Sequence, residues 1–450
     1  MTTTTCSPVH ELTADFSRIA GSIRPLNSTN LGPLSMHGCL DTTSYYRELG
    51  FPFVRLHDAP YAMFNTVDIS NIFPLFHADE TDPANYVFAP TDDYIQSILD
   101  CGGRIVYRLG QTIEHNKRRK YFIHPPIDTA KWARICVNIV RHYNEGWANG
   151  HRHGIRHWEI WCEPEINLLW SGTPDQYFQL YETTARALKA HDPDLMVGGP
   201  AACDFDDFSR NFATYCRDHQ IPLDFFSWHN YNGIQKTYTA AIEVRTFLDG
   251  LGLNRVESHL NEWSRCFDGF VHMSDPGRLA GPMFARVAGP EGAAFVAAML
   301  CLMQDLPLDM ANYYWALPGG WGMFDSFGAP NKLYFSFKAF RLLRDLTPQR
   351  VQVTGNDPAT GVAILAGLAE DGRSAGVLVA NAEGPGSNWN GRGKLRLTLT
   401  GLPWVAEARV HVIDASHSLS PRETIPVTRE PFELELPAPA AVWLELRPAP

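Results

Sequence analysis

From about residue 27 to residue 345, short hydrophobic runs alternate with amphipathic segments. Runs rich in β-branched and aromatic residues predict strands, and segments with apolar side chains three and four residues apart predict helices. The predicted strands cover residues 28–34, 53–57, 104–109, 158–162, 196–199, 225–229, 258–262 and 312–317. The predicted helices cover residues 91–100, 128–144, 174–191, 238–251 and 291–305.

Eight strands alternating with helices over roughly 300 residues are typical of a (β/α)8 barrel. A doubly wound sheet is the alternative, but no G-x-G-x-x-G motif opens a helix after the first strand. We therefore predict an α/β fold in which residues 27–345 form a (β/α)8 TIM barrel.

After residue 346 the pattern changes to short alternating runs separated by Gly, Pro and Thr, which is typical of an antiparallel β-sandwich. These runs cover residues 362–368, 375–380, 394–399, 408–413, 432–436 and 442–446. We predict an accessory β-sandwich domain over residues 346–450. The strand-like run at residues 10–16 has no place in the barrel, so the N-terminal segment 1–26 is expected to join the sandwich.

Composition and charge limit the classes of function that are compatible with this chain. Hydrophobic residues make up 45% of the 450 residues and charged residues 19%, enough for a large core. A formal net charge of -11 disfavours binding to nucleic acid or to an anionic membrane. The sequence has no long apolar run and no signal-peptide pattern, so we expect a cytoplasmic protein. Its nine cysteines form no C-x-x-C pair, so we expect no metal or redox motif.

Two glutamates carry the candidate chemistry. Glu163 ends the fourth predicted strand and Glu262 the seventh, and active sites of such barrels lie at the carboxyl ends of the strands. Strands four and seven face each other across the barrel, so the two carboxyl groups can meet. A carboxyl pair is sufficient to cleave a glycosidic bond without a cofactor. The alternative for each glutamate alone is a helix cap or an ion pair.

The other candidate substrate-binding residues end predicted strands or lie in the loops that follow them. They are His57, Asp58, Arg108, Cys162, His229, Tyr231, Trp315 and Trp321. Alternatives remain for several: His57 could be a packed core histidine, Arg108 an internal ion-pair partner and Trp315 a plug of the barrel. The 12 tryptophans are consistent with stacking on sugar rings.

The run W-E-I-W-C-E-P-E at residues 158–165 resembles the W-E-x-W-N-E-P-N/D signature of glycoside hydrolase family 39, which contains β-xylosidases and α-L-iduronidases. The runs V-R-L-H at 54–57, F-S-W-H at 226–229 and L-N-E-W at 260–263 also resemble that family. The resemblance implies that Glu163 is the general acid/base and Glu262 the nucleophile of a retaining enzyme. It also implies a hydrogen bond from Tyr231 to the nucleophile.

One position departs from the family pattern. Cys162 stands where the family has an asparagine that bonds the sugar 2-hydroxyl, and a thiol is a weak donor with a shorter reach. Two neighbouring carboxylates, Glu159 and Glu165, are the alternatives to Glu163. Glu159 lies four residues back on the same strand face and is expected to point into the barrel and bond Arg or His there.

These observations predict a retaining, exo-acting, β-xylosidase-like glycoside hydrolase. The same mechanism on an arabinoside, galactoside, glucoside or iduronide, or endo action, stays open. A non-catalytic carbohydrate-binding pseudoenzyme is the alternative from a different class. The sequence does not indicate the oligomeric state, although the resemblance allows a homo-oligomer.

Overall fold

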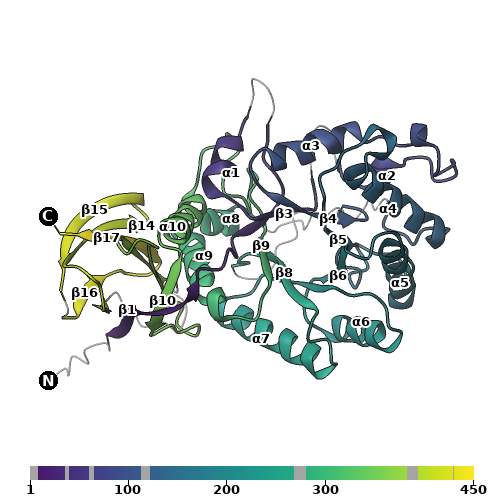
Figure 1. Cartoon of the computed structure of the whole chain (residues 1–450). Helices are drawn as coiled ribbons and strands as arrows, with labels where there is room; N and C mark the ends of the chain where they lie inside the picture. The colour runs from purple at the N-terminus through teal and green to yellow at the C-terminus, as the bar shows by residue number, and fades with distance from the viewer. Residues whose placement is uncertain are drawn as a thin grey trace.

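Eight parallel strands close into a barrel in the computed structural model, which describes residues 9–35, 40–59, 65–112, 122–267, 280–382, 394–428 and 430–449. The strands follow one another around the barrel in chain order (Figure 1). They are β2 Ser28–Asn30, β3 Phe53–Leu56, β4 Arg104–Leu109, β5 His157–Ile160, β6 Met196–Ala202, β7 Phe225–Asn230, β8 Glu257–Trp263 and β9 Met310–Tyr313. The predicted (β/α)8 TIM barrel is confirmed.

Several strands end earlier than the sequence predicts: β2 stops at Asn30 and not at residue 34, and β3 stops one residue early. β5 stops at Ile160, because the backbone turns left-handed at Trp161, with φ of 70°. β9 stops at Tyr313, so Trp315 lies in the loop beyond the strand. The candidate residues after these strands therefore sit on loops at the barrel rim and not on the strands themselves.

Helices form an outer layer around the strands (Figure 1). They are α1 Thr43–Leu49, α2 Ile69–Ile72, α3 Ala89–Leu99, α4 Thr129–Asn144, α5 Pro174–His191, α6 Asp207–Asp218, α7 Ile234–Gly250, α8 Ala280–Ala288, α9 Pro290–Leu302 and α10 Lys332–Leu346, with 3₁₀ turns η1 Pro83–Asn85, η2 Trp147–Asn149 and η3 Met303–Asp305. The start of α5 is fixed by a capping box between Thr173 and Gln176, with Pro174 in the first turn. Helix α7 begins four residues before the predicted start, because Ile234 already packs into the core.

The remaining strands form one nine-stranded sheet in the order β15-β14-β17-β12-β11-β10-β1-β13-β16. Its strands are β1 His10–Ser22, β10 Gln349–Thr354, β11 Val362–Leu368, β12 Ala375–Asn381, β13 Lys394–Thr400, β14 Ala406–Ile413, β15 Ser418–Val427, β16 Phe432–Glu435 and β17 Ala440–Pro448. β1 pairs with β10 and, in parallel, with β13, and the other pairs are antiparallel. The predicted sandwich is thus a single antiparallel-rich sheet that curls around its own core.

Each face of this sheet buries a different core. Along β11, Ala363 and Leu365 pack with the barrel residues, whereas Ile364 and Ala366 pack among the other strands of the sheet. Successive side chains of a strand point to opposite faces, so one strand serves both cores. Helix α9 lies between barrel and sheet and is buried along residues 292–302.

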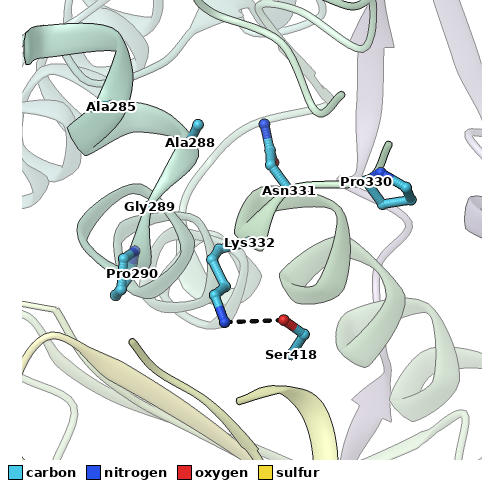
Figure 2. Close-up of a pocket in the computed structure, with 8 residues that line it drawn as sticks. All are labelled: Ala285, Ala288, Gly289, Pro290, Pro330, Asn331, Lys332 and Ser418. Carbon is cyan, nitrogen blue, oxygen red and sulfur yellow. Dashed lines mark hydrogen bonds between the residues drawn. The ribbon is translucent and has the colours of Figure 1, made fainter. Parts of the chain in front are cut away.

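An open pocket of about 350 Å³ lies where the barrel helices meet the sheet (Figure 2). It is lined by Ala285, Ala288, Gly289, Pro290, Pro330, Asn331, Lys332 and Ser418. The ammonium of Lys332 donates to the hydroxyl of Ser418 at 2.9 Å and to the carbonyl of His417 at 2.7 Å. These bonds tie α10 to β15, and none of the candidate site residues borders this pocket.

Within the described residues, no single helix has the length and apolar character to cross a membrane. The bent pair Gly281–Ala288 and Pro290–Asp305 meets those two criteria only when its halves are taken together.

Candidate active site

Glu163 is positioned by the turn that follows β5. Its own φ is 47°, and its N–H donates to the carbonyl of Ala201 on β6 at 2.9 Å. On the other side of the turn, the N–H of Trp161 donates to the carbonyl of Leu109 on β4 at 2.8 Å. Left-handed backbone is unfavourable for side chains larger than glycine, so the two flanking strands hold this turn in place. The side chain of Glu163 is 10% exposed at the barrel rim.

Glu262 lies within β8 and is 2% exposed. Its Oε1 accepts from Arg55 Nη1 at 2.7 Å, and its Oε2 accepts from the Tyr231 hydroxyl at 2.6 Å. Burial raises the pKa of Glu262 above its ordinary value, whereas Arg55 and the Tyr231 hydroxyl act in the opposite direction by stabilising the carboxylate. The carboxylate is thus held at both oxygens in a fixed orientation.

A buried polar network lies beneath Glu262 inside the barrel. Arg55, which is fully buried, donates to Glu159 Oε2 at 2.6 Å and to Asn30 Oδ1 at 3.0 Å. Asn261 Nδ2 donates to Glu159 Oε1 at 2.5 Å. The expectation that Glu159 bonds an arginine inside the barrel is confirmed. One guanidinium therefore separates two carboxylates, Glu159 and Glu262.

His229 bridges the two candidate catalytic carboxyl groups. Its Nδ1 lies 2.8 Å from Glu163 Oε1 and 3.4 Å from Glu262 Oε2. One oxygen from each glutamate and one His229 nitrogen all lie within 4.8 Å of one another. Burial lowers the pKa of His229 to about 4, so the ring is neutral at physiological pH. The structure brings together the two glutamates that the sequence singled out.

Cys162 lies near Oε1 of Glu262, the oxygen that accepts from Arg55. Its Sγ accepts from Arg55 Nη2 at 3.3 Å and lies 3.9 Å from Glu262 Oε1 and 3.7 Å from His57 Nε2. Burial raises the pKa of the Cys162 thiol well above its ordinary value, so the sulfur stays protonated and uncharged. His57 Nε2 is also 3.6 Å from Glu262 Oε1 and 3.4 Å from Asp58 Oδ2.

Aromatic rings line the side of the site near Tyr231. Its ring lies 5.9 Å from that of Trp321 and 6.1 Å from that of Tyr314, whose hydroxyl donates to Asp58 Oδ2 at 3.0 Å. The half-buried Trp315 ring lies 4.7 Å from Tyr314. Tyr314 and Trp321 are each 6% exposed, so packed aromatic rings enclose this side of the site and Trp315 is the more accessible ring.

Arg108 forms its ion pair with Asp68 and not with either candidate catalytic glutamate. It is fully buried, and its Nη2 donates to Asp68 Oδ1 at 2.8 Å. This contact matches the alternative role of an internal ion-pair partner. A contact with sugar stays a prediction for this residue.

The position of Arg55 disfavours a bound metal ion at Glu163 and Glu262. Glu262 groups with His57 and Cys162, and also with Glu163 and His229, at spacings that a metal could use. However, the Arg55 guanidinium already donates to both Glu262 and Cys162. A second positive charge next to it is repelled.

The family model "Glycosyl hydrolases family 39" matches residues 16–353. The chain belongs to this family. A β-xylosidase of Caldicellulosiruptor saccharolyticus is 25% identical over 348 residues, covering 71% of this chain and 67% of that enzyme. Among solved structures, a glucosidase from Croceicoccus marinus aligns with a TM-score of 0.80 and 25% identity over 99% of this chain and all of that chain. A monomeric β-xylosidase from Caulobacter crescentus aligns with a TM-score of 0.73 and 18% identity, over 98% of this chain and all of that one.

This family 39 chain is a glycoside hydrolase. Among the neighbours of its carboxylates, Glu165 accepts from the N–H of Cys203 at 2.5 Å. Burial, and then the charge of Glu163, raise the pKa of Glu165 to about 8. A neutral carboxyl group at this position adds no negative charge beside Glu163.

Sequence reasoning missed three residues around the site, namely Asn30, Asn261 and Tyr314. Asn261 stands directly before Glu262 in the sequence, and this position is the signal that could have identified it. Asn30 belongs to a three-residue strand with too few positions to show alternation. Tyr314 directly follows the last barrel strand and precedes the candidate residue Trp315, and this position in the sequence is the signal that could have identified it.

Proposed function

We propose that this enzyme is a retaining, exo-acting glycosidase of the β-xylosidase type, with Glu262 as nucleophile and Glu163 as general acid/base. The observation that carries the proposal is the convergence of both carboxylates and His229 within 4.8 Å. Retaining enzymes hold their carboxyl groups about 5–5.5 Å apart, whereas inverting enzymes leave about 6.5–9.5 Å for a water molecule. The closest oxygens of Glu163 and Glu262 lie within 4.8 Å of each other, which is compatible with the retaining spacing.

In the first step, a Glu262 oxygen forms a bond to C1 of the sugar while the bond from C1 to the leaving oxygen breaks. The proton of Glu163 passes to that leaving oxygen. In the second step, water gives a proton to Glu163 as its oxygen bonds to C1, and Glu262 leaves as a carboxylate. The hydrogen bonds from Arg55 and Tyr231 keep Glu262 ionised and aimed before the first step.

The neutral His229 ring contacts both carboxyl groups without adding charge. It therefore orients Glu163 and does not draw off its proton as a strong base would. The half-buried Trp315 ring is the member of the aromatic cluster that is accessible enough to stack on the apolar face of a sugar ring.

The substrate class rests on relatives. The β-xylosidase of Caldicellulosiruptor saccharolyticus supports a xyloside, and the similarity to the Croceicoccus marinus glucosidase over nearly the whole chain supports a glucoside as the second candidate. The two sugars differ only by the substituent at C5, so one mechanism serves both.

The test is a panel of aryl glycosides: β-xyloside, β-glucoside, β-galactoside, α-L-arabinoside and β-mannoside. Glu262→Ala is expected to lose the activity and to regain part of it with azide, giving a glycosyl azide of inverted configuration. Glu163→Gln is expected to lose activity mainly on substrates with poor leaving groups, while Glu165→Gln serves as the neighbouring control and stays active. Sugar binding without hydrolysis of aryl or natural glycosides would instead support a pseudoenzyme.

A further inference from the structure

Three side chains far from the catalytic glutamates converge in the outer helical layer. Asp92 belongs to the first turn of α3, His142 to the last turn of α4, and His151 to the segment between η2 and β5. One ligand-type atom from each lies within 4.8 Å of the other two. Three separate stretches of chain therefore meet at one small polar centre.

The hydrogen bonds of His142 set the chemistry of this centre. Its Nδ1 lies 2.9 Å from the carbonyl oxygen of Trp147, which can only accept, so Nδ1 carries a proton. In a neutral ring, Nε2 then presents its lone pair, and Nε2 lies 3.0 Å from Asp92 Oδ1. A lone pair and a carboxylate at this distance need either a second proton or a cation between them. A histidine that donates through its other nitrogen to a carbonyl is the usual form of a metal ligand.

The third side chain favours the cation. His151 Nε2 lies 3.6 Å from Asp92 Oδ2, too far for a good hydrogen bond. Zinc bonds nitrogen and oxygen ligands at about 2.0–2.2 Å in a tetrahedron, which separates neighbouring ligand atoms by roughly 3.3–3.5 Å. The two observed contacts are 3.0 Å from His142 Nε2 to Asp92 Oδ1 and 3.6 Å from His151 Nε2 to Asp92 Oδ2. They end on different oxygens, so a small rotation of the Asp92 carboxylate is needed for one oxygen to bind the ion together with both histidines.

The surroundings hold these ligands in place. The His142 ring is 1% exposed and stacks on Phe88 with centroids 3.5 Å apart. The N–H of His151 donates to the carbonyl of His142 at 2.6 Å, and the His153 ring stacks on His151 at 4.6 Å. The ligands are thus ordered by packing and by backbone bonds, as a preformed site requires.

Local charge also favours a cation. In the described part of the chain, the ion pairs of Asp92 are those with His142 and His151, and neither a lysine nor an arginine pairs with it. A second His–Glu–His group, His157 with Glu257 and His259, has similar spacing. There, burial and then the charge of His259 lower the pKa of His157 to about 4, and the positive charges of Arg104 and Arg156 add to this effect. The same positive charges oppose a metal ion.

We propose that Asp92, His142 and His151 bind one Zn²⁺ ion, with water in the fourth position, at a site that joins α3, α4 and the approach to β5. The site is separate from the hydrolytic centre, whose chemistry needs no metal. Its role is to stabilise the fold, since a metal that binds only the folded state raises the unfolding temperature.

The test uses untagged full-length protein, freed of metal by chelator and then titrated with Co²⁺ as a spectroscopic probe and with Zn²⁺ by calorimetry. Wild type is expected to bind one ion, to show the intense visible absorption of tetrahedral Co²⁺, and to gain about 3 °C in Tm with excess Zn²⁺. His151→Gln changes a half-buried ring and is expected to abolish all three signals while the protein remains folded and active. Asp92→Asn is expected to do the same.

Glu257→Gln is the matched control, because it alters the competing cluster only and is expected to keep the metal. Absence of stoichiometric binding by wild type overturns the proposal and leaves a direct hydrogen bond between His142 and Asp92. Binding that survives in His151→Gln, or that is lost in Glu257→Gln, also overturns it.

Discussion

Replacing Arg55 by methionine tests whether the buried guanidinium holds both the fold and the nucleophile. Arg55 is fully buried and forms ion pairs with Glu159 at 2.6 Å and with Glu262 at 2.7 Å. Removal of one partner from a buried ion pair costs about 3–5 kcal/mol, because the remaining charge has no compensation. With an unfolding entropy of about 2.1 cal/mol/K per residue over 450 residues, each kcal/mol shifts the Tm by about 1 °C, so the Tm is expected to fall by roughly 3–5 °C.

The assay is thermal unfolding alongside kcat/KM at several pH values. The surface variant Arg134→Met is the control, because Arg134 pairs with Glu80 at the same 2.7 Å but is 54% exposed. An exposed pair is worth about 0–1 kcal/mol, so the control is expected to lose little stability and no activity. In the double variant Arg55→Met/Glu159→Gln, one unpaired carboxylate is removed, so part of the stability returns. Activity stays low because Glu262 still lacks its cation. The reasoning is refuted if Arg55→Met unfolds like the control and keeps its activity.

Three further predictions concern the neighbours of the glutamates. Tyr231→Phe removes a 2.6 Å hydrogen bond to ionised Glu262, so the pKa of Glu262 is expected to rise further. The acid limb of the pH profile of kcat/KM then moves to higher pH, and an acid limb that stays in place contradicts this role for Tyr231. Its plateau kcat/KM is expected to drop about 10-fold or more. Cys162→Asn introduces a stronger donor near Glu262, so the kcat/KM ratio between a glycoside and its 2-deoxy analogue is expected to rise about 10-fold over wild type; an equal ratio places the 2-hydroxyl elsewhere. The folded pKa of Glu165 is about 8, above its ordinary 4.5, so its protonated form stabilises the fold at low pH and that contribution is lost as pH rises through 8. Glu165→Gln is therefore expected to narrow the Tm difference between about pH 5 and pH 9, and an unchanged difference argues against a neutral Glu165.

Much of the barrel could be predicted from the sequence because its strands are continuous apolar runs bounded by turns. Each predicted strand overlaps one observed barrel strand, and both glutamates lie at the same rim. The expectation that Glu159 bonds Arg or His inside the barrel also holds, because Glu159 lies within β5, where alternate side chains point into the barrel.

Other features depended on contacts that no local pattern contains. β15 is largely exposed and carries Pro421 and Pro426, so it has no alternation of buried and exposed residues to recognise. The two faces of β11 pack into two different cores, so its sequence is apolar at nearly every position. Such a run does not indicate which face of the strand contacts the barrel. The bridging of Glu163 and Glu262 by His229 requires three strands to be placed in space, and only the closed barrel does that.

Accumulation of a covalent intermediate on Glu262 tests the central claim most directly. The enzyme is incubated with the activated 2-deoxy-2-fluoro form of whichever aryl glycoside it hydrolyses fastest, and its peptides are analysed by mass spectrometry. The account predicts one fluoroglycosyl group on the peptide that contains Glu262, located on that side chain by fragmentation, and no label in Glu262→Ala. A label on another residue, or turnover of the parent glycoside with inversion of the anomeric configuration, contradicts it.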